Sequence, residues 1–311
     1  MSHLSPLRVK NYFFSNHQRL SDYTWFHFLS RSWLIIQDRD AKKILDQIFD
    51  QEIKDQQTEY QIKTLQHYLK NPLDPVLPER VAYLNKYPDL RPLTRDSLTA
   101  IFAQKLWKLD LKQVLKSWQP QQLDQVANRL WLDQPAMLSL ATYAINFLTL
   151  YYYSFAEDRF ANCIDHLYQI IDEAWEKLSQ VPGGLQSIAY FVTHIIINDS
   201  LFYTRPIPKE RRELHLRFLD RLVTEIYPDR ITDVSVDCHC EIQTCYLILE
   251  SISPFMELAK QYVEQHTDPT NQFLIEEHQK SVPFSRIEHQ NVLYTVGFGN
   301  ASTIRIKEDF R

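Results

Sequence analysis

The sequence predicts an all-α protein, built either as a multi-helix bundle or as an array of α/α hairpins. Apolar residues recur at intervals of three and four along most of the chain, which is the spacing that gives a helix one buried face. Only four glycines occur in 311 residues, whereas Pro, Asn and Asp, which form turns without glycine, are spread along the chain. The periodic segments are joined by short connections, as is typical of antiparallel helical hairpins.

The first expected helices lie before a cluster of prolines. Asp40 suits a helix N-cap, and apolar residues follow at helical spacing over residues 44–69. Prolines at positions 72, 75 and 78 then interrupt the pattern, because proline lacks the N–H group that a helix interior needs. We therefore expect an N-terminal helical segment over residues 1–72.

A main helical domain is expected over residues 73–290. Pro78 suits the first turn of its first helix, which runs to Tyr87, since a first helical residue needs no N–H donor. No internal repeat is found, so a regular solenoid is not established. Further helical segments are expected over 94–109, 111–118, 121–132, 135–155, 157–179, 185–203, 208–227, 234–252 and 254–266.

The last segment, residues 291–311, carries a different pattern. Apolar residues alternate over 292–298, and Ile304 and Ile306 alternate again after a Gly-Phe-Gly-Asn sequence. Alternation is typical of strands, and glycine and asparagine are typical of hairpin turns. We expect a small C-terminal β-hairpin or a tail that folds onto its own domain.

The composition limits the class of function. The chain has only four glycines, the first of them Gly183. Their positions match neither the glycine pattern of a P-loop nor that of a dinucleotide-binding loop. The net charge of −5, without a separate basic face, argues against nucleic acid as a partner. Four cysteines are too few for a secreted disulfide framework in a chain of this length. The N-terminus has no basic region followed by an apolar run, so we expect a cytoplasmic protein with reduced thiols.

One expected helix, over residues 135–155, is apolar on every side. It is long enough for a membrane span, but it has neither a basic flank nor a second comparable span, so we expect it in the protein interior. Asn146 shares a face with the hydroxyl residues Ser139, Thr142 and Thr149. This face either lines a polar cavity, or its hydroxyls bond their own helix while Asn146 bonds a neighbouring helix.

A second apolar helix, residues 188–199, places His194 in the middle of an apolar run. Asn198 lies four residues on and shares its face. A buried polar group needs a partner. His194 is therefore either part of a functional site or a neutral core histidine that is bonded to a carbonyl. Asp199 follows directly, and Arg205 could turn inward to pair with Asp199 or Asp237.

The strongest candidates for catalytic or metal-ligating residues lie at the start of the helix expected over residues 234–252. Asp237 and Glu241 are four residues apart and project together, whereas His239 points away from them. A carboxylate pair facing His194 would suit a divalent metal ion or a general acid/base pair. The alternative is that Asp237 caps the helix and Glu241 bonds first-turn amides.

The cysteines offer a rival site. Cys163 and His166 are three residues apart, and Cys238 and Cys240 lie elsewhere in the sequence. Together these four side chains would supply the ligands of a tetrahedral zinc site. A cysteine nucleophile paired with His166 or His239 is a further hypothesis. The alternative for all of them is core packing.

Residues 185–252 also carry a resemblance to known proteins. The order Thr193-His194, Asp199, Arg205-Pro206 and Asp237-x-x-x-Glu241 is similar to uncharacterised bacterial all-helical families of unknown function, which implies a helical fold and a bacterial origin. The aromatic-rich paired helices also resemble α/α-toroid enzymes, among them lanthionine cyclases. The glycine-rich turns and the Cys-His-Gly ligand motif of those cyclases are missing here.

Two functional hypotheses follow. The first is a binding or interaction protein that holds a peptide or small molecule in an interior polar pocket, with Asn146, Asn198, Asp199 and Arg205 as binding residues. The second is a metal-dependent or general acid/base hydrolase or transferase. Its catalytic and metal-ligating residues would be His194, Asp237 and Glu241. The sequence leaves open whether the protein is an enzyme.

Overall fold

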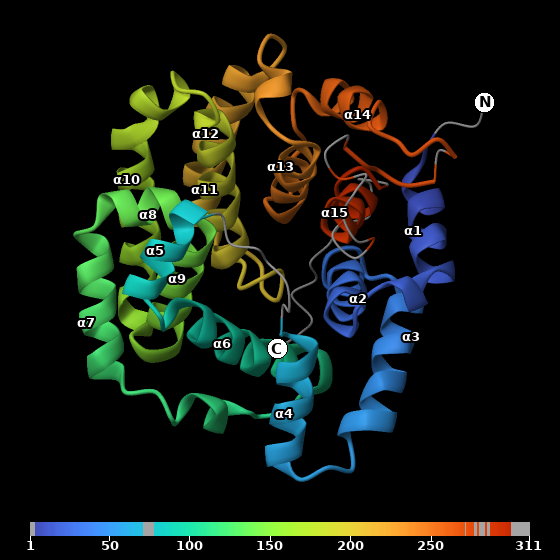
Figure 1. Ribbon diagram of the computed structural model, residues 1–311, viewed down its shortest axis with the longest axis vertical. Coiled ribbons are helices and arrows are strands. Elements are labelled where there is room, and N and C mark those ends of the chain that lie inside the picture. The colour runs from blue at the N-terminus through green and yellow to red at the C-terminus, as the bar shows by residue number, and fades with distance from the viewer. Residues whose placement is uncertain are drawn as a thin grey trace. The chain divides into compact units, whose positions relative to one another are not determined.

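The structure, a computed structural model, confirms the all-α fold class (Figure 1). It describes residues 4–70, 78–270, 272–276, 279, 284 and 287–299. In this part of the chain fifteen α-helices and no β-strand occur. The helices form two compact units, one of residues 1–47 and 205–311 and the other of residues 48–204.

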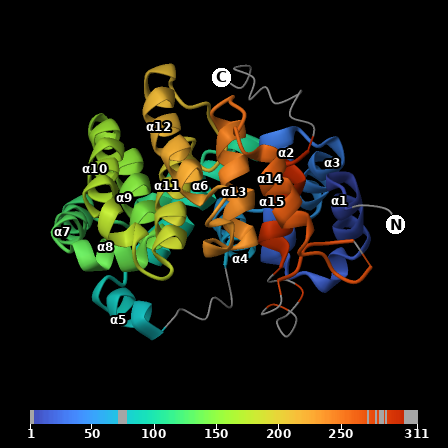
Figure 2. The same ribbon diagram turned by 90° about the horizontal axis from the view of Figure 1, so that it is seen from above.

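The first unit, called unit 1 here, combines both ends of the chain. Its central helix is α15, which packs against α13, α1 and α2 (Figure 2). Nine of the ten residues of α15 are buried, and the exception is the half-buried His289. The helices of unit 1 are α1 (Pro6–Ser15), α2 (Asp22–Ile36), α3 (Arg39–Ile48), α12 (Lys209–Ile226), α13 (Val236–Ile248), α14 (Met256–Glu264) and α15 (Glu288–Gly297).

The expected C-terminal hairpin is wrong for the residues that the structure describes. Residues 292–297 belong to α15, and Phe298 follows it as the C-cap. A helix that is buried on all sides shows no 3.6-residue period, so a short apolar run within it can alternate like a strand. The second half of the expected hairpin, with Ile304 and Ile306, lies outside the described residues.

The other unit, unit 2, is built around α9, which packs against α6, α10 and α11. Its residue Thr149 is fully buried, whereas Thr142 and Asn146 are half-buried. The helices of unit 2 are α4 (Thr58–Tyr68), α5 (Pro78–Lys86), α6 (Leu90–Trp107), α7 (Pro120–Trp131), α8 (Gln134–Leu140), α9 (Thr142–Phe155), α10 (Phe160–Ser179) and α11 (Gly184–Asp199). Short helical turns η2 (Phe49–Ile53), η3 (Lys112–Leu115) and η4 (Glu157–Arg159) connect them.

The long apolar helix expected over residues 135–155 is two helices. Ala141 has a φ of 37° and a ψ of −100°, a conformation that lies outside the helical region and ends α8 before α9 begins. In the described residues, no helix has the length and the apolar character that crossing a bilayer requires.

The two units meet in the sequence after residues 47 and 204, whereas the expected boundaries lay near residues 72 and 290. The proline cluster does fall between α4 and α5, but α4 packs against α6 of the same unit, so this break lies inside unit 2. Position 290 lies inside α15. Breaks in helical pattern mark the ends of helices, and they mark a domain boundary only where few contacts cross them.

Candidate metal centre

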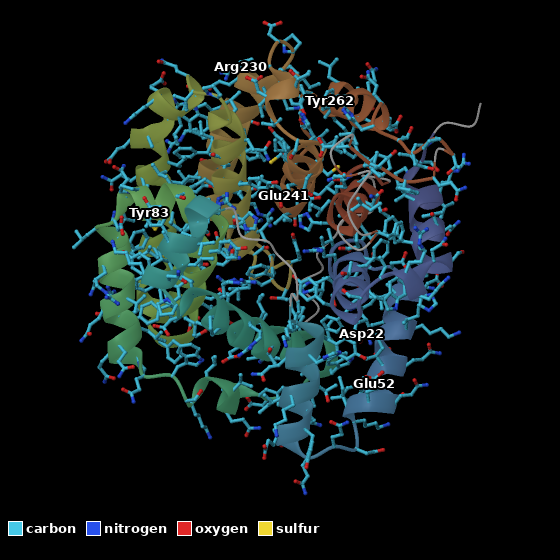
Figure 3. The ribbon with its side chains drawn as sticks, viewed as in Figure 1. Asp22, Glu52, Tyr83, Arg230, Glu241 and Tyr262 are labelled. Carbon is cyan, nitrogen blue, oxygen red and sulfur yellow. The ribbon has the colours of Figure 1, made fainter. Side chains whose placement is uncertain are left out.

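Asp237 and Glu241 lie one turn apart on α13, as the sequence predicted. The expected alternative, in which Asp237 caps this helix, is wrong because Ser235 is the N-cap and its Oγ accepts a hydrogen bond of 3.3 Å from the Cys238 N–H. The Asp237 carboxylate is therefore available for contacts with another helix. Figure 3 labels Glu241 on α13.

The histidine that meets these carboxylates is His289 on α15. Its Nδ1 atom lies 2.6 Å from Oδ1 of Asp237, and its Nε2 atom lies 3.8 Å from Oε1 of Glu241. One ligand atom from each of Asp237, Glu241 and His289 can be chosen so that all three lie within 4.8 Å of one another. Among the described residues, this is the one group of three or more His, Cys, Asp or Glu side chains with such spacing.

Solvent reaches this group from one side. The side chain of Glu241 is 2% exposed, that of Asp237 is 19% exposed and that of His289 is 38% exposed. The group therefore has a buried end at Glu241 and an open end at His289, which would let an ion or a small ligand enter.

The charges of the group favour a cation. Burial disfavours the charged imidazolium, but the Asp237 and Glu241 carboxylates outweigh burial and raise the pKa of His289 above its ordinary value. The two carboxylates thus favour a positive charge in this group. A histidine that ligates a metal ion must be neutral, so a bound ion would supply this positive charge in place of a proton.

A third carboxylate, Glu288, lies beside the group at the start of α15. Its Oε2 is 3.8 Å from Nη1 of Arg31 on α2, which is too long for a hydrogen bond. Its Oε1 is buried, and no described residue gives it a hydrogen bond. Burial raises the pKa of Glu288 to about 7, against the opposing charges of Arg31 and His289. A buried carboxyl oxygen without a partner is rare, and such groups often mark sites where water, an ion or a ligand is held.

His194 and Asn198 share a face of α11, as their spacing predicted, and both meet Asn146 of α9 in unit 2. The Asn198 amide donates to Oδ1 of Asn146 at 2.7 Å, and Nδ1 of His194 lies 3.4 Å from the same oxygen. Thr149 donates to the Ile145 carbonyl at 2.7 Å and lies 2.6 Å from Oδ1 of Asn198. This is the expected alternative in which the hydroxyl bonds its own helix and Asn146 bonds a neighbouring one.

The histidine in the group with Asp237 and Glu241 is His289, and the expected partnership of His194 with these carboxylates stays a prediction. His194 lies on α11 in unit 2, and one of its neighbours on another helix is Asn146. Asp199 is buried at the last residue of α11. The ion pair of Arg205 with Asp199 or Asp237 stays a prediction.

The cysteines do not form the rival site in the described part of the chain. All four are buried thiols outside any disulfide, and the metal-capable group of the described residues contains none of them. Burial raises the pKa of Cys163, Cys240 and Cys245, which disfavours the reactive thiolate. The His239 ring is held between the Tyr227 hydroxyl at 2.5 Å and the Ile231 carbonyl at 2.9 Å. Core packing therefore accounts for the cysteines.

His289 was not among the residues predicted for the site, and the reason is physical. Residues 292–298 were expected to form a strand, and a strand places no helical face next to α13. The signal that could have found His289 is the Glu288-His289 pair directly before an apolar run, because a polar pair at the start of a buried helix needs partners.

The chain was compared with protein-family models, curated proteins and solved structures, and none of them matches it.

Proposed function

We propose that unit 1 binds one divalent transition-metal ion through Asp237, Glu241 and His289. The observation that carries the proposal is the convergence of one nitrogen and two carboxylate oxygens within 4.8 Å. Ligand atoms lie about 2.0–2.2 Å from zinc and so up to about 4 Å from one another. Small side-chain rotations would therefore complete the site.

The donor set indicates the kind of ion. One imidazole and two carboxylates suit zinc, manganese or ferrous iron, whereas calcium and magnesium prefer oxygen ligands alone. Two carboxylate charges also balance the charge of a divalent ion. Glu288, whose Oε1 has no hydrogen-bond partner among the described residues, supplies a further acceptor beside His289, of the kind that orients ligands or bound water.

Three protein ligands indicate a reactive rather than a structural site. Structural zinc sites use four protein ligands, while catalytic sites use three and leave a position for water or substrate. A bound ion would supply a water molecule whose pKa is near 7, and this is the nucleophile of metal-dependent hydrolysis. The partly exposed His289 leaves the group open to solvent. We therefore place the function in the class of metal-dependent hydrolases, and the pairing of α13 with α15 would position the ligands.

The test is the metal content of protein purified without an affinity tag, measured by elemental mass spectrometry. We expect close to one equivalent of zinc, manganese or iron in the wild-type protein, and loss of the ion in Asp237→Asn and His289→Ala. Asp237→Asn keeps the size of the side chain, so it separates lost ligation from lost packing. His17→Ala is the matched control because His17 is an exposed histidine of unit 1. Equal metal content in all four proteins would refute the proposal.

A further inference from the structure

Unit 2 has a hollow on its surface between α7, α9 and α10. Its volume is about 280 Å³. An apolar cavity of about 150 Å³ is enough to hold benzene, so the hollow has room for one aromatic ring with a substituent. The hollow is lined by Trp131, Tyr152, Arg159, Asn162, Cys163 and His166.

Three of the lining residues present polar groups that are available to a ligand. Arg159, Asn162 and His166 fall at intervals of three and four residues and therefore form one stripe along the start of α10. The side chains of Asn162 and His166 have no hydrogen-bond partner among the described residues, and both are exposed. Their amide and ring nitrogens are free to bind a ligand.

The Arg159 guanidinium is held in one position by its neighbours, but not all of its N–H donors make hydrogen bonds. One N–H donates to Oδ1 of Asp124 at 3.1 Å, and a second lies 3.4 Å from the Tyr152 hydroxyl. The guanidinium also lies over the Tyr152 ring, 5.0 Å from its centroid. A guanidinium has five N–H donors, so three remain beyond these two contacts. A cation held in one orientation loses little conformational entropy when it binds an anion.

The remaining lining is apolar or aromatic. The Trp131 ring is stacked on the His166 ring, with centroids 4.4 Å apart and planes 6° apart, and its Nε1–H is bonded to Tyr152 at 3.0 Å. Cys163 is buried, and burial raises the pKa of its thiol, so it adds a neutral surface. These walls favour an apolar body over a small hydrated ion.

We infer that this hollow binds a small organic carboxylate with one aromatic ring, with its carboxylate on Arg159 and Asn162 and its ring against Trp131 and Tyr152. The Asp124 carboxylate keeps its hydrogen bonds from Tyr151 and Asn128, at 3.0 Å each, so a ligand can share the guanidinium with it. This site lies in unit 2 and does not depend on the metal centre proposed for unit 1.

Titration of the full-length wild-type protein with benzoate, followed by tryptophan fluorescence and calorimetry, tests the inference. We expect saturable binding with a dissociation constant in the millimolar range or below. Benzamide, which has the same ring without the charge, and inorganic phosphate, which has charge without the ring, should each bind at least about tenfold more weakly. Equal binding of either probe, or no saturable binding of benzoate up to about 20 mM, a concentration well above the expected constant, would overturn the inference.

Two variants locate the site. Arg159→Gln should weaken benzoate binding at least about tenfold, because it removes a charge-assisted hydrogen bond. Arg230→Gln is the matched control, since Arg230, labelled in Figure 3, is a half-buried arginine of unit 1 that is likewise paired with an aspartate, Asp233. It should leave the affinity unchanged. Equal affinity of the Arg159→Gln and wild-type proteins would show that benzoate does not bind in this hollow.

Discussion

Nδ1 of His289 lies 2.6 Å from Oδ1 of Asp237, and this contact joins α15 to α13 at the one residue of α15 that is not fully buried. Every other residue of α15 is packed against the rest of unit 1. The position of the imidazole is therefore set by the packing of the whole helix, and changes that shift α15 against α13 should disturb the candidate metal centre.

Gly297, the last residue of α15, provides the first prediction. An added Cβ would lie 3.1 Å from the Gln243 Cβ, 3.2 Å from the Cys240 carbonyl oxygen and 3.3 Å from the Thr244 nitrogen. Two of these are backbone atoms of α13, which cannot move aside alone. Gly297→Ala should lower the free energy of unfolding by about 1–3 kcal/mol through overpacking, as measured by urea denaturation. It should also weaken metal binding.

The sign of the stability change caused by Gly297→Ala shows whether α15 approaches α13 closely. In a helix without close neighbours, replacing glycine by alanine stabilises by about 1 kcal/mol. A stabilised Gly297→Ala protein would therefore contradict the close approach of α15 to α13.

The polar network of unit 2 gives a second prediction. The Asn198 side chain is buried and bonds Asn146, Thr149 and the His194 carbonyl, the last at 2.8 Å. Asn198→Ala should lower the free energy of unfolding by about 1–3 kcal/mol, because buried partners lose their hydrogen bonds. Thermal and urea unfolding would measure the loss.

Asn128→Ala is the control for that experiment. Its amide bonds Asp124 in an exposed position, so its removal should change the stability by less than about 0.5 kcal/mol. If both variants lose the same stability, the buried network is not what holds α9 and α11 together.

Asp268, in the loop after α14, makes stability depend on pH. Burial alone would raise its pKa, but hydrogen bonds from Thr270 and from the backbone of Gln272 and Phe273 lower it below the ordinary value of 3.8. The unfolded state therefore takes up the proton more readily than the folded state. The stabilisation is complete above the unfolded pKa and is lost as the pH falls through the lower folded pKa.

The corresponding measurement is urea unfolding of wild-type and Asp268→Asn proteins at pH 7 and near pH 3. At pH 7 the variant should be less stable by about 1–3 kcal/mol, because hydrogen bonds to a charged group are lost. The difference should shrink at the lower pH. A difference that is the same at both pH values would show that the charge of Asp268 contributes nothing.

The sequence carried enough information for the fold class and for two of the three residues of the candidate site. Helical spacing and scarce glycine predicted the helices, and the four-residue interval of Asp237 and Glu241 placed both carboxylates on one face. The shared face of His194 and Asn198 was also confirmed. These are local properties, which depend on residues that are near each other in the sequence.

The remaining features depend on contacts between distant segments. α15 is buried on nearly all sides, so its pattern of apolar residues could not distinguish helix from strand, and His289 was missed with it. The break at Ala141 and the division of the chain near residues 47 and 204 are set by packing rather than by turn residues. Such contacts leave no periodic signal in one sequence.

Calorimetric titration of metal-free protein with Zn²⁺ and Mn²⁺ tests the central claim most directly. We predict one binding site per chain in the wild-type protein, and a loss of affinity of at least about tenfold for each missing ligand in Asp237→Asn, Glu241→Gln and His289→Ala, with His17→Ala unchanged. Binding that persists at wild-type affinity in all three ligand variants, or no binding to the wild-type protein, would contradict the account.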